Sequence, residues 1–166
     1  MRRHERGLTL IELMVTLAVL AFLMLLGVTL GSDWVHSART QQARSDLEQG
    51  WGLAKALALR NPCQVVSEEA SAYLQLSRAP EGGYSAEVQA WGLPANCSYV
   101  AQRGGPEWAL QLANGVQVLL NGTPMEAGTQ HRWLINSRGL LVHSASNVDV
   151  VVRQGGAQND ETIQWN

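Results

Sequence analysis

A single carboxylate, Glu12, lies in an otherwise apolar stretch close to the N-terminus. A charged side chain in nonpolar surroundings costs about a few kcal/mol unless it is neutralised or paired. Glu12 can therefore extend toward a polar surface at the start of this stretch, or pair with a cation that another chain supplies. The chemistry available to it is electrostatic pairing, and local chemistry alone leaves both alternatives open.

The residues after Glu12 are numerous enough to cross a bilayer. From Leu13 to Ser32 the sequence has 20 residues without a charge. At about 1.5 Å per residue, such a helix spans roughly 30 Å, the thickness of the hydrocarbon core. No small-residue cleavage site of a secretory signal follows. Arginines at positions 2, 3 and 6 predict a cytoplasmic N-terminus. A plain signal anchor is one interpretation of this pattern.

The residues around Glu12 also resemble a processing signal. The stretch Gly7-Leu8-Thr9-Leu10-Ile11-Glu12-Leu13, with its basic leader and apolar continuation, is similar to the N-terminus of type IV pilins and type II secretion pseudopilins. The resemblance implies cleavage between Gly7 and Leu8, N-methylation of Leu8, and pairing of Glu12 with a neighbouring subunit's terminal amine. The family usually has phenylalanine at the position of Leu8. The following segment, residues 14–21, resembles the minor pilins of the GspH/FimT (FimU-like) group.

This resemblance implies a complete organisation of the chain. Residues 1–7 are expected to be a prepilin leader, residues 8–32 a transmembrane or filament-core helix, and residues 33–166 a periplasmic pilin domain. The expected partners are prepilin peptidase, the inner membrane, and other pilins or pseudopilins that bind through the N-terminal helix. The expected function is that of a non-enzymatic minor subunit, which helps to initiate or cap a type IV pilus or a type II secretion pseudopilus.

The elements that position these residues follow from hydrophobic periodicity. Apolar residues at helical spacing continue beyond the membrane segment, and Asn61-Pro62 ends the pattern. We therefore expect one helix from about Leu8 to Arg60, weakened by about 1 kcal/mol at each exposed glycine. The residues of the apolar stripe are Ala43, Leu47, Trp51, Ala54 and Ala58, and the glycines are Gly27, Gly31, Gly50 and Gly52.

The remainder of the chain predicts antiparallel strands that pack on this helix, an α+β fold. Asn121-Gly122 is the strongest hairpin signal, and Val148–Val152 is apolar enough to be placed against the helix. The predicted strands are Cys63–Ser67, Tyr73–Arg78, Tyr84–Trp91, Ser98–Gln102, Trp108–Leu112, Val116–Leu120, Arg132–Ile135, Leu140–His143, Val148–Arg153 and Thr162–Trp165.

The two cysteines, Cys63 and Cys97, follow the membrane segment and would lie in an oxidising periplasm. A disulfide between them closes a loop of 33 residues and would stabilise the fold by about 4 kcal/mol in the loop-entropy model. We favour this bridge over two buried free thiols, because the sequence has neither a metal motif nor a redox motif.

Catalytic signals are missing from the sequence. The histidines after the leader, His36, His131 and His143, stand alone, and there is no metalloprotease, serine-hydrolase or phosphate-loop motif. The chain is thus expected to be no enzyme and to need no cofactor, with a signal-anchored periplasmic enzyme as an alternative. Asn159-Asp160-Glu161 could bind calcium, but such a loop is more often a solvated turn, so no metal site is predicted.

The charge balance disfavours a nucleic-acid partner. The 166 residues include 12 basic and 14 acidic side chains, whereas a protein that coats nucleic acid needs a cationic excess. A DNA-uptake receptor is the second alternative, and it would need a basic strip. Arg132 and Arg138 are close in sequence and could be joined by Arg103 and Arg153, but residues 154–166 contain acidic residues and no basic ones.

The tryptophans could line a ligand platform or fill the core. Trp34, at the expected membrane exit, is most simply an interfacial anchor. Trp91, Trp108 and Trp133 fall in predicted strands and are expected to belong to the core. Trp165 could be a last-strand residue or an exposed contact.

Overall fold

The structure is a computed structural model of the chain, and it describes residues 9–66, 68–92, 97–142, 148–154 and 160–165. The side chains of residues 26–33, 101 and 103 lie outside this description. The chain forms two compact units, residues 1–36 and 37–166, and each is treated by itself below.

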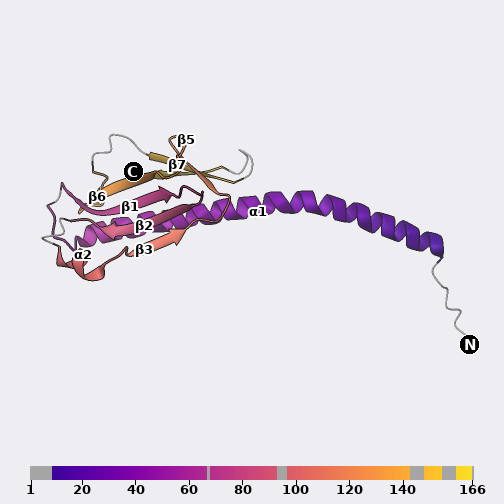
Figure 1. Cartoon of the computed structure of the whole chain (residues 1–166), viewed down its shortest axis with the longest axis horizontal. Coiled ribbons are helices and arrows are strands. Elements are labelled where there is room, and N and C mark those ends of the chain that lie inside the picture. The colour runs from indigo at the N-terminus through magenta and orange to yellow at the C-terminus, as the bar shows by residue number, and fades with distance from the viewer. Residues whose placement is uncertain (1–8, 67, 93–96, 143–147, 155–159, 166) are drawn as a thin grey trace, which may run out of the picture. The chain divides into compact units, whose positions relative to one another are not determined.

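The first element is one long helix, α1 (Leu10–Arg60), in agreement with the predicted helix (Figure 1). It ends where the sequence indicates. Asn61 has a left-handed backbone with φ of 45°, and its N–H donates to the carbonyl oxygen of Ala58 at 3.1 Å. Pro62 follows and lacks the N–H that would be needed to extend the helix.

The predicted apolar stripe of α1 forms one wall of the core in residues 37–166. Its members and the neighbouring Leu57 are all buried, with Leu47 fully so. Small residues at three of these positions let the helix approach the sheets closely, since alanine adds only one methyl group to the backbone. The residues confirmed on this stripe are Ala43, Leu47, Trp51, Ala54 and Ala58.

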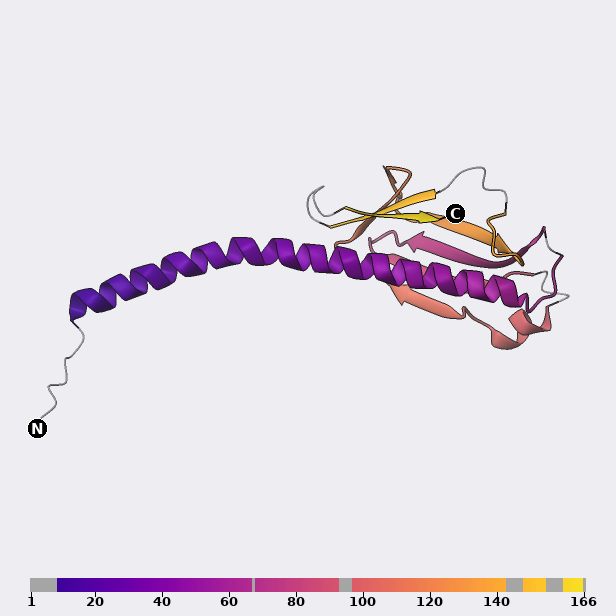
Figure 2. The ribbon, with the colours of Figure 1, turned by 180° about the vertical axis from the view of Figure 1, so that it is seen from behind.

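Two four-stranded antiparallel sheets complete this unit. Both views show β1, β2 and β3 alongside the C-terminal part of α1 (Figures 1 and 2). The first sheet has the order β3 (Trp108–Gln111), β2 (Tyr84–Ala90), β1 (Ala70–Arg78) and β6 (Gln130–Asn136). The second has the order β5 (Thr123–Pro124), β4 (Gln117–Leu120), β7 (Val148–Arg153) and β8 (Glu161–Trp165).

The Asn-Gly hairpin and the buried position of β7 are confirmed. Asn121 and Gly122 connect β4 to β5 with φ angles of 50° and 79°, the conformation that favours asparagine and glycine in two-residue turns. Val150 and Val152 of β7 are fully buried, and they belong to the same core cluster as Leu47 of α1.

A group of three tryptophans joins the helix to both sheets. The ring of Trp165 on β8 stacks on Trp51 of α1, with centroids 5.1 Å apart, and its edge meets Trp133 of β6 at 4.4 Å. Trp133 and Trp165 are among the largest fully buried side chains. Arg44 of α1 adds an ion pair to Glu161 of β8 at 2.7 Å.

Three of the predicted strands differ from the structure. Ser98–Gln102 is helical and belongs to α2 (Ser98–Arg103). Gly104, with φ of 66°, caps this helix by donating its N–H to the carbonyl oxygen of Val100. The described part of Cys63–Ser67 contains no strand, and the described part of Leu140–His143 contributes a single bridge between Ile135 and Leu141.

The expectation that Trp91 belongs to the core is wrong. Its side chain is 39% exposed and lies outside the core cluster, whereas Trp108 is partly buried against that cluster. Trp34 is also exposed. The buried residues of β2 alternate from Tyr84 to Ala90, so Trp91, one position later, falls on the opposite face.

Within the part of the chain that the structure describes, no helix is both long enough and apolar enough to cross a membrane.

Gly50 is needed for close packing and does not merely weaken α1. A Cβ atom at this position would lie 2.6 Å from Cζ3 of Trp108, which is closer than packed carbon atoms can approach. Gly52, two residues later, has no neighbouring atom within 4 Å of the corresponding position. The two glycines therefore form a matched pair, in which only one has a packing role.

Substituting alanine at these two positions should change stability in opposite directions. Gly50→Ala should lower the free energy of unfolding by about 1 kcal/mol, because overpacking costs about 1–3 kcal/mol and helix propensity returns about 1 kcal/mol. Gly52→Ala should raise it by about 0.5–1 kcal/mol. Urea unfolding followed by tryptophan fluorescence measures both. An equal gain for the two variants would show that Trp108 moves aside at no cost.

Candidate functional site

The start of α1 holds the residues that the sequence singled out for assembly. Gly7 and Leu8, the predicted cleavage and methylation positions, lie outside the described residues. The description begins at Thr9, and Glu12 is in the first turn of the helix. The geometry of the site can therefore be derived from Thr9 onward.

Thr9 and Glu12 form a reciprocal capping box. The carbonyl of Thr9 accepts the first helical hydrogen bond, from the N–H of Leu13 at 3.2 Å. The hydroxyl of Thr9 accepts from the N–H of Glu12 at 3.3 Å, and Oε2 of Glu12 accepts from the N–H of Thr9 at 3.1 Å. This pattern satisfies two amide groups that the start of a helix otherwise leaves without partners.

The carboxylate of Glu12 retains capacity for a further partner. Both hydrogen bonds from Thr9, by its N–H and its hydroxyl, end on Oε2. Among the residues that the structure describes, none donates to Oε1. A carboxylate has about four acceptor positions, so Oε1 can accept from an ammonium group while the capping box stays in place. The side chain is exposed and reachable by a second molecule.

The helix that follows Glu12 is apolar on every side. All residues from Leu10 to Leu25 are exposed, and the large apolar ones have between 50 and 77% of their surface uncovered. The hydroxyl of Thr16 donates to the carbonyl of Leu13 at 2.9 Å, so this polar group is satisfied inside the helix. An apolar surface on every side is typical of helices that lipid or other apolar helices cover.

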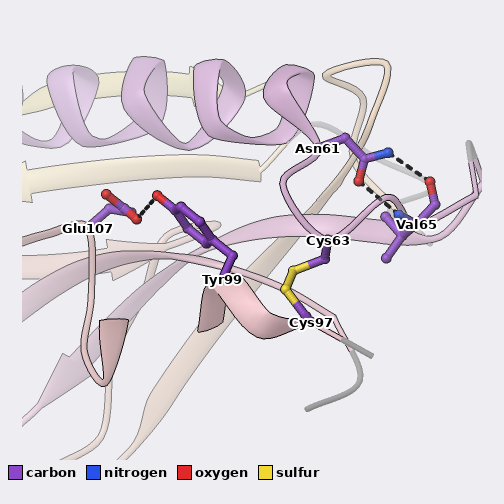
Figure 3. Close-up of a disulfide and its surroundings, with 6 residues drawn as sticks. All are labelled: Asn61, Cys63, Val65, Cys97, Tyr99 and Glu107. Atoms are coloured by element: carbon purple, nitrogen blue, oxygen red, sulfur yellow. Dashed lines mark hydrogen bonds between the residues drawn. A yellow bond between two sulfur atoms is a disulfide. The ribbon is translucent and has the colours of Figure 1, made fainter. Parts of the chain in front are cut away.

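A disulfide joins Cys63 and Cys97, with their Cα atoms 4.9 Å apart, as the sequence favoured (Figure 3). Cys63 follows the end of α1, and Cys97 immediately precedes α2. The amide of Asn61 holds the same loop, since it donates to the carbonyl of Val65 at 2.8 Å and accepts from its N–H at 2.9 Å. The bridge thus ties the C-terminal end of α1 to the loop before α2.

The surroundings of the bridge are closely packed. A Cβ atom at Gly92 would lie 2.8 Å from Cβ of Cys63, so this position accepts no larger residue without movement. On the far side of α2, the hydroxyl of Tyr99 donates to the carboxylate of Glu107 (Figure 3). Cys97 is buried at 2% exposure, in accordance with a structural role for the bridge.

The carboxylates weighed for calcium are engaged with arginines. Asp160 accepts from Nε of Arg153 at 2.6 Å, and Glu161 accepts from Nη1 of Arg44 at 2.7 Å. The hydrogen bond from Arg153 is the main cause of the lowered pKa of Asp160. Asn159 lies outside the described residues, and within those residues no group of three or more His, Cys, Asp or Glu side chains could hold a metal ion.

The arginines weighed for a basic strip are in separate environments. Arg138 pairs with Glu68 at 3.2 Å, and Arg153 pairs with Asp160. Arg132 lies over the ring of Tyr73, with its Cζ atom 4.6 Å from the ring centroid. Only the backbone of Arg103 is described.

The histidines also lie in different environments. His131 contacts Trp133 and has a pKa lowered by burial, whereas His143 lies outside the described residues.

Sequence reasoning missed two features of these sites. The capping box has a readable signal, because Thr9-Leu10-Ile11-Glu12 fits the pattern of serine or threonine followed three residues later by glutamate. The cluster of Arg132, Tyr73 and Trp91 has no such signal, since 57 residues separate Arg132 from its partner Gln75. Only the register of three strands brings the members together.

Comparison with known proteins identifies one feature. The family model described as the prokaryotic N-terminal methylation motif matches residues 2–28, a segment that contains Gly7, Leu8 and Glu12. The match indicates a type IV pilin-like or pseudopilin protein, which is a generally structural class. No curated protein and no solved structure matches the chain.

Proposed function

We propose, from the methylation motif at residues 2–28, that the chain is a minor pilin or pseudopilin of the GspH/FimT type. Such a subunit has no catalytic role and helps to initiate or cap a type IV pilus or a type II secretion pseudopilus. Prepilin peptidase cleaves between Gly7 and Leu8 and methylates the new terminal amine of Leu8. The observation that carries the proposal is Glu12, at the start of an all-round apolar helix, because one of its carboxylate oxygens accepts no hydrogen bond from the residues that the structure describes.

The mechanism of assembly follows from the surface of this helix. Before assembly the apolar side chains at residues 10–25 are covered by inner-membrane lipid, and afterwards by the corresponding helices of neighbouring subunits. Glu12 pairs with the Leu8 amine of a neighbour. Because an unpaired charge in apolar surroundings costs several kcal/mol, neighbouring helices dock only in the register that brings the two groups together.

Localisation is part of the same proposal. Residues 8–32 anchor the subunit as a single pass through the inner membrane, and the three arginines of the leader keep the N-terminus in the cytoplasm. The globular domain then lies in the periplasm. The disulfide between Cys63 and Cys97 supports this side of the membrane, since such bonds persist in oxidising compartments.

The intact mass of the protein tests the proposal directly. The full chain is expressed with active prepilin peptidase and with an inactivated peptidase, and both forms are extracted from the membrane. We expect the active enzyme to remove residues 1–7 and add one methyl group to Leu8, and the inactive one to leave the chain uncut. A control pilin establishes that the peptidase is active.

An uncut chain in the presence of active peptidase would overturn the proposal. Glu12 would then be a capping residue of a signal anchor, and the role of the globular domain, residues 37–166, would be open again.

If processing occurs, a strain from which this subunit is deleted distinguishes a type IV pilus from a type II secretion system. Loss of pilus-dependent motility identifies a type IV pilus subunit, whereas loss of exoprotein release identifies a type II secretion subunit.

A further inference from the structure

β1, one of the two inner strands of the first sheet, has a second face that the core does not use. Ala72, Leu74 and Leu76 of β1 belong to the core cluster, and alternation along a strand directs the intervening Tyr73 and Gln75 to the opposite face. Both are nonetheless nearly buried, at 7% and 8% exposure. Side chains from neighbouring strands must therefore cover them.

Arg132 provides much of this cover. It lies opposite Gln75 in the pairing of β6 with β1, and its Nε and Nη2 both donate to Oε1 of Gln75, at 2.9 and 2.5 Å. Its Cζ atom is 4.6 Å from the ring centroid of Tyr73 and 5.4 Å from that of Trp91. The guanidinium is thus held by two aromatic rings and one amide, in the manner of a preorganised binding group.

No carboxylate among the described residues forms an ion pair with Arg132. Arg44, Arg138 and Arg153 each pair with a carboxylate, whereas the partner of Arg132 is the neutral Gln75. Glu87 lies opposite Gln75 on the other neighbouring strand, and its charge acts on Tyr73 as that of Arg132 does, although no ion pair joins these two described side chains. The Nη1 group donates to none of the described residues, so one edge of the guanidinium can bind an external carboxylate.

An apolar groove of about 930 Å³ adjoins this arginine. Tyr73 and Trp91 belong both to the stack under Arg132 and to the groove wall, so the two features are continuous. The rest of the wall includes the aliphatic side chains of Val66, Val100, Leu134 and Val142 and the polar side chains of Gln64, Glu68, Glu69 and Gln89. A ligand in this groove would bury apolar groups and hold a negative charge at its Arg132 side.

We propose that this groove and Arg132 bind an extended peptide segment of a partner protein, with a carboxylate side chain beside an apolar one. The acidic side chain pairs with the guanidinium of Arg132, and the apolar side chain enters the groove beside Trp91. The site lies on the face of the sheet that is turned away from the core. Its existence does not depend on processing at Gly7 or on filament assembly.

A peptide fits this surface better than a nucleic acid or a glycan. A phosphate backbone needs more cationic groups than the one arginine beside the groove. Glycan hydroxyls need many polar partners, whereas most of the groove wall is apolar. A single carboxylate next to an apolar side chain matches both the charge and the lining.

Titration with short blocked peptides tests the proposal. The full-length ¹⁵N-labelled chain is placed in lipid nanodiscs, so that no detergent occupies the groove, and the probe is acetyl-Leu-Asp-Leu-amide. We expect shifts of the Arg132 Nε–H and Trp91 indole resonances, and a Kd about ten-fold lower than that of acetyl-Leu-Asn-Leu-amide. Arg132→Gln should abolish the preference for aspartate, and Arg132→Lys should reduce it because lysine lacks the planar fork.

The control variant is Arg39→Gln, which removes an exposed arginine from α1 and should leave both affinities unchanged. An unaltered Trp165 indole resonance would show that the variants keep the core intact. Equal binding of the aspartate and asparagine peptides would overturn the proposal. Sodium acetate that binds as tightly as the aspartate peptide would also overturn the proposal, because the site would then be a simple anion site. Tighter binding of glucuronate or of an oligothymidylate than of the peptide would overturn it as well.

Discussion

Replacing Glu12 by glutamine is expected to lower the amount of this subunit in sheared filaments by about ten-fold or more. Glutamine at this position can still accept a hydrogen bond from the N–H of Thr9, so the capping box survives while the negative charge is lost. Removing one partner of a desolvated ion pair costs about 3–5 kcal/mol, and ten-fold corresponds to only about 1.4 kcal/mol. Immunoblotting of filaments against total membrane protein gives the ratio.

Matched variants separate the charge of Glu12 from its capping role. Glu12→Ala removes both and should be incorporated as poorly as Glu12→Gln. Thr9→Ala removes the hydroxyl cap, at a cost of about 1 kcal/mol to the helix, but leaves the carboxylate free to pair. It should therefore assemble at close to the normal level, and Thr9→Ser should be indistinguishable from the parent chain.

The opposite ranking would contradict ion pairing between subunits. If Glu12→Gln assembles normally and Glu12→Ala and Thr9→Ala both fail, the carboxylate acts only by capping its own helix. Urea unfolding of the outer domain should be the same for all four variants, because Thr9 and Glu12 belong to the other compact unit. A loss of stability there would mean that the change in assembly has another cause.

The double substitution Cys63→Ala with Cys97→Ala is expected to lower the free energy of unfolding by about 4 kcal/mol. The bridge closes 33 intervening residues, and the loop-entropy model gives this value for such a length. The measurement is urea unfolding of the full chain in micelles, followed by the fluorescence of the buried tryptophans. The comparison is with the parent chain under non-reducing conditions.

The loop after α1 is also held by hydrogen bonds that do not depend on the disulfide. The two hydrogen bonds between Asn61 and Val65 order the loop after α1 without help from the sulfur atoms. If they alone hold this loop, the double alanine variant would lose less than about 1 kcal/mol, and Asn61→Ala would be the more damaging change. A large loss for the cysteine variant and a small one for Asn61→Ala would assign the restraint to the disulfide.

Much of α1 and most of the strands could be predicted because their signals are local. The stripe from Ala43 to Ala58 repeats at helical spacing, and Asn121-Gly122 demands positive φ angles that few other residue pairs tolerate. α2 was missed because six residues give too short a period to separate a helix from a strand. Gly104 was the available signal, and glycine ends both kinds of element.

The candidate sites also differ in whether their signals are local in the sequence. Gly7, Leu8 and Glu12 are contiguous enough to be recognised as a motif, and the capping box lies within four residues of sequence. The pairing of Arg132 with Gln75, by contrast, depends on which strand lies beside β1. A sequence gives the alternation along each strand but not the order of strands in a sheet, so this face could not be assembled in advance.

The position of the disulfide in the sequence has a consequence for the order of folding. The bridge encloses β1 and β2, and with α1 these elements are complete before any residue of β4, β7 or β8 is synthesised. A covalently closed hairpin on the helix can thus form early, as local contacts close faster than distant ones. β6 must later add to the open edge of β1, after β4 and β5 have been made. The slow step of folding is therefore expected to be the docking of β6 together with the C-terminal strands.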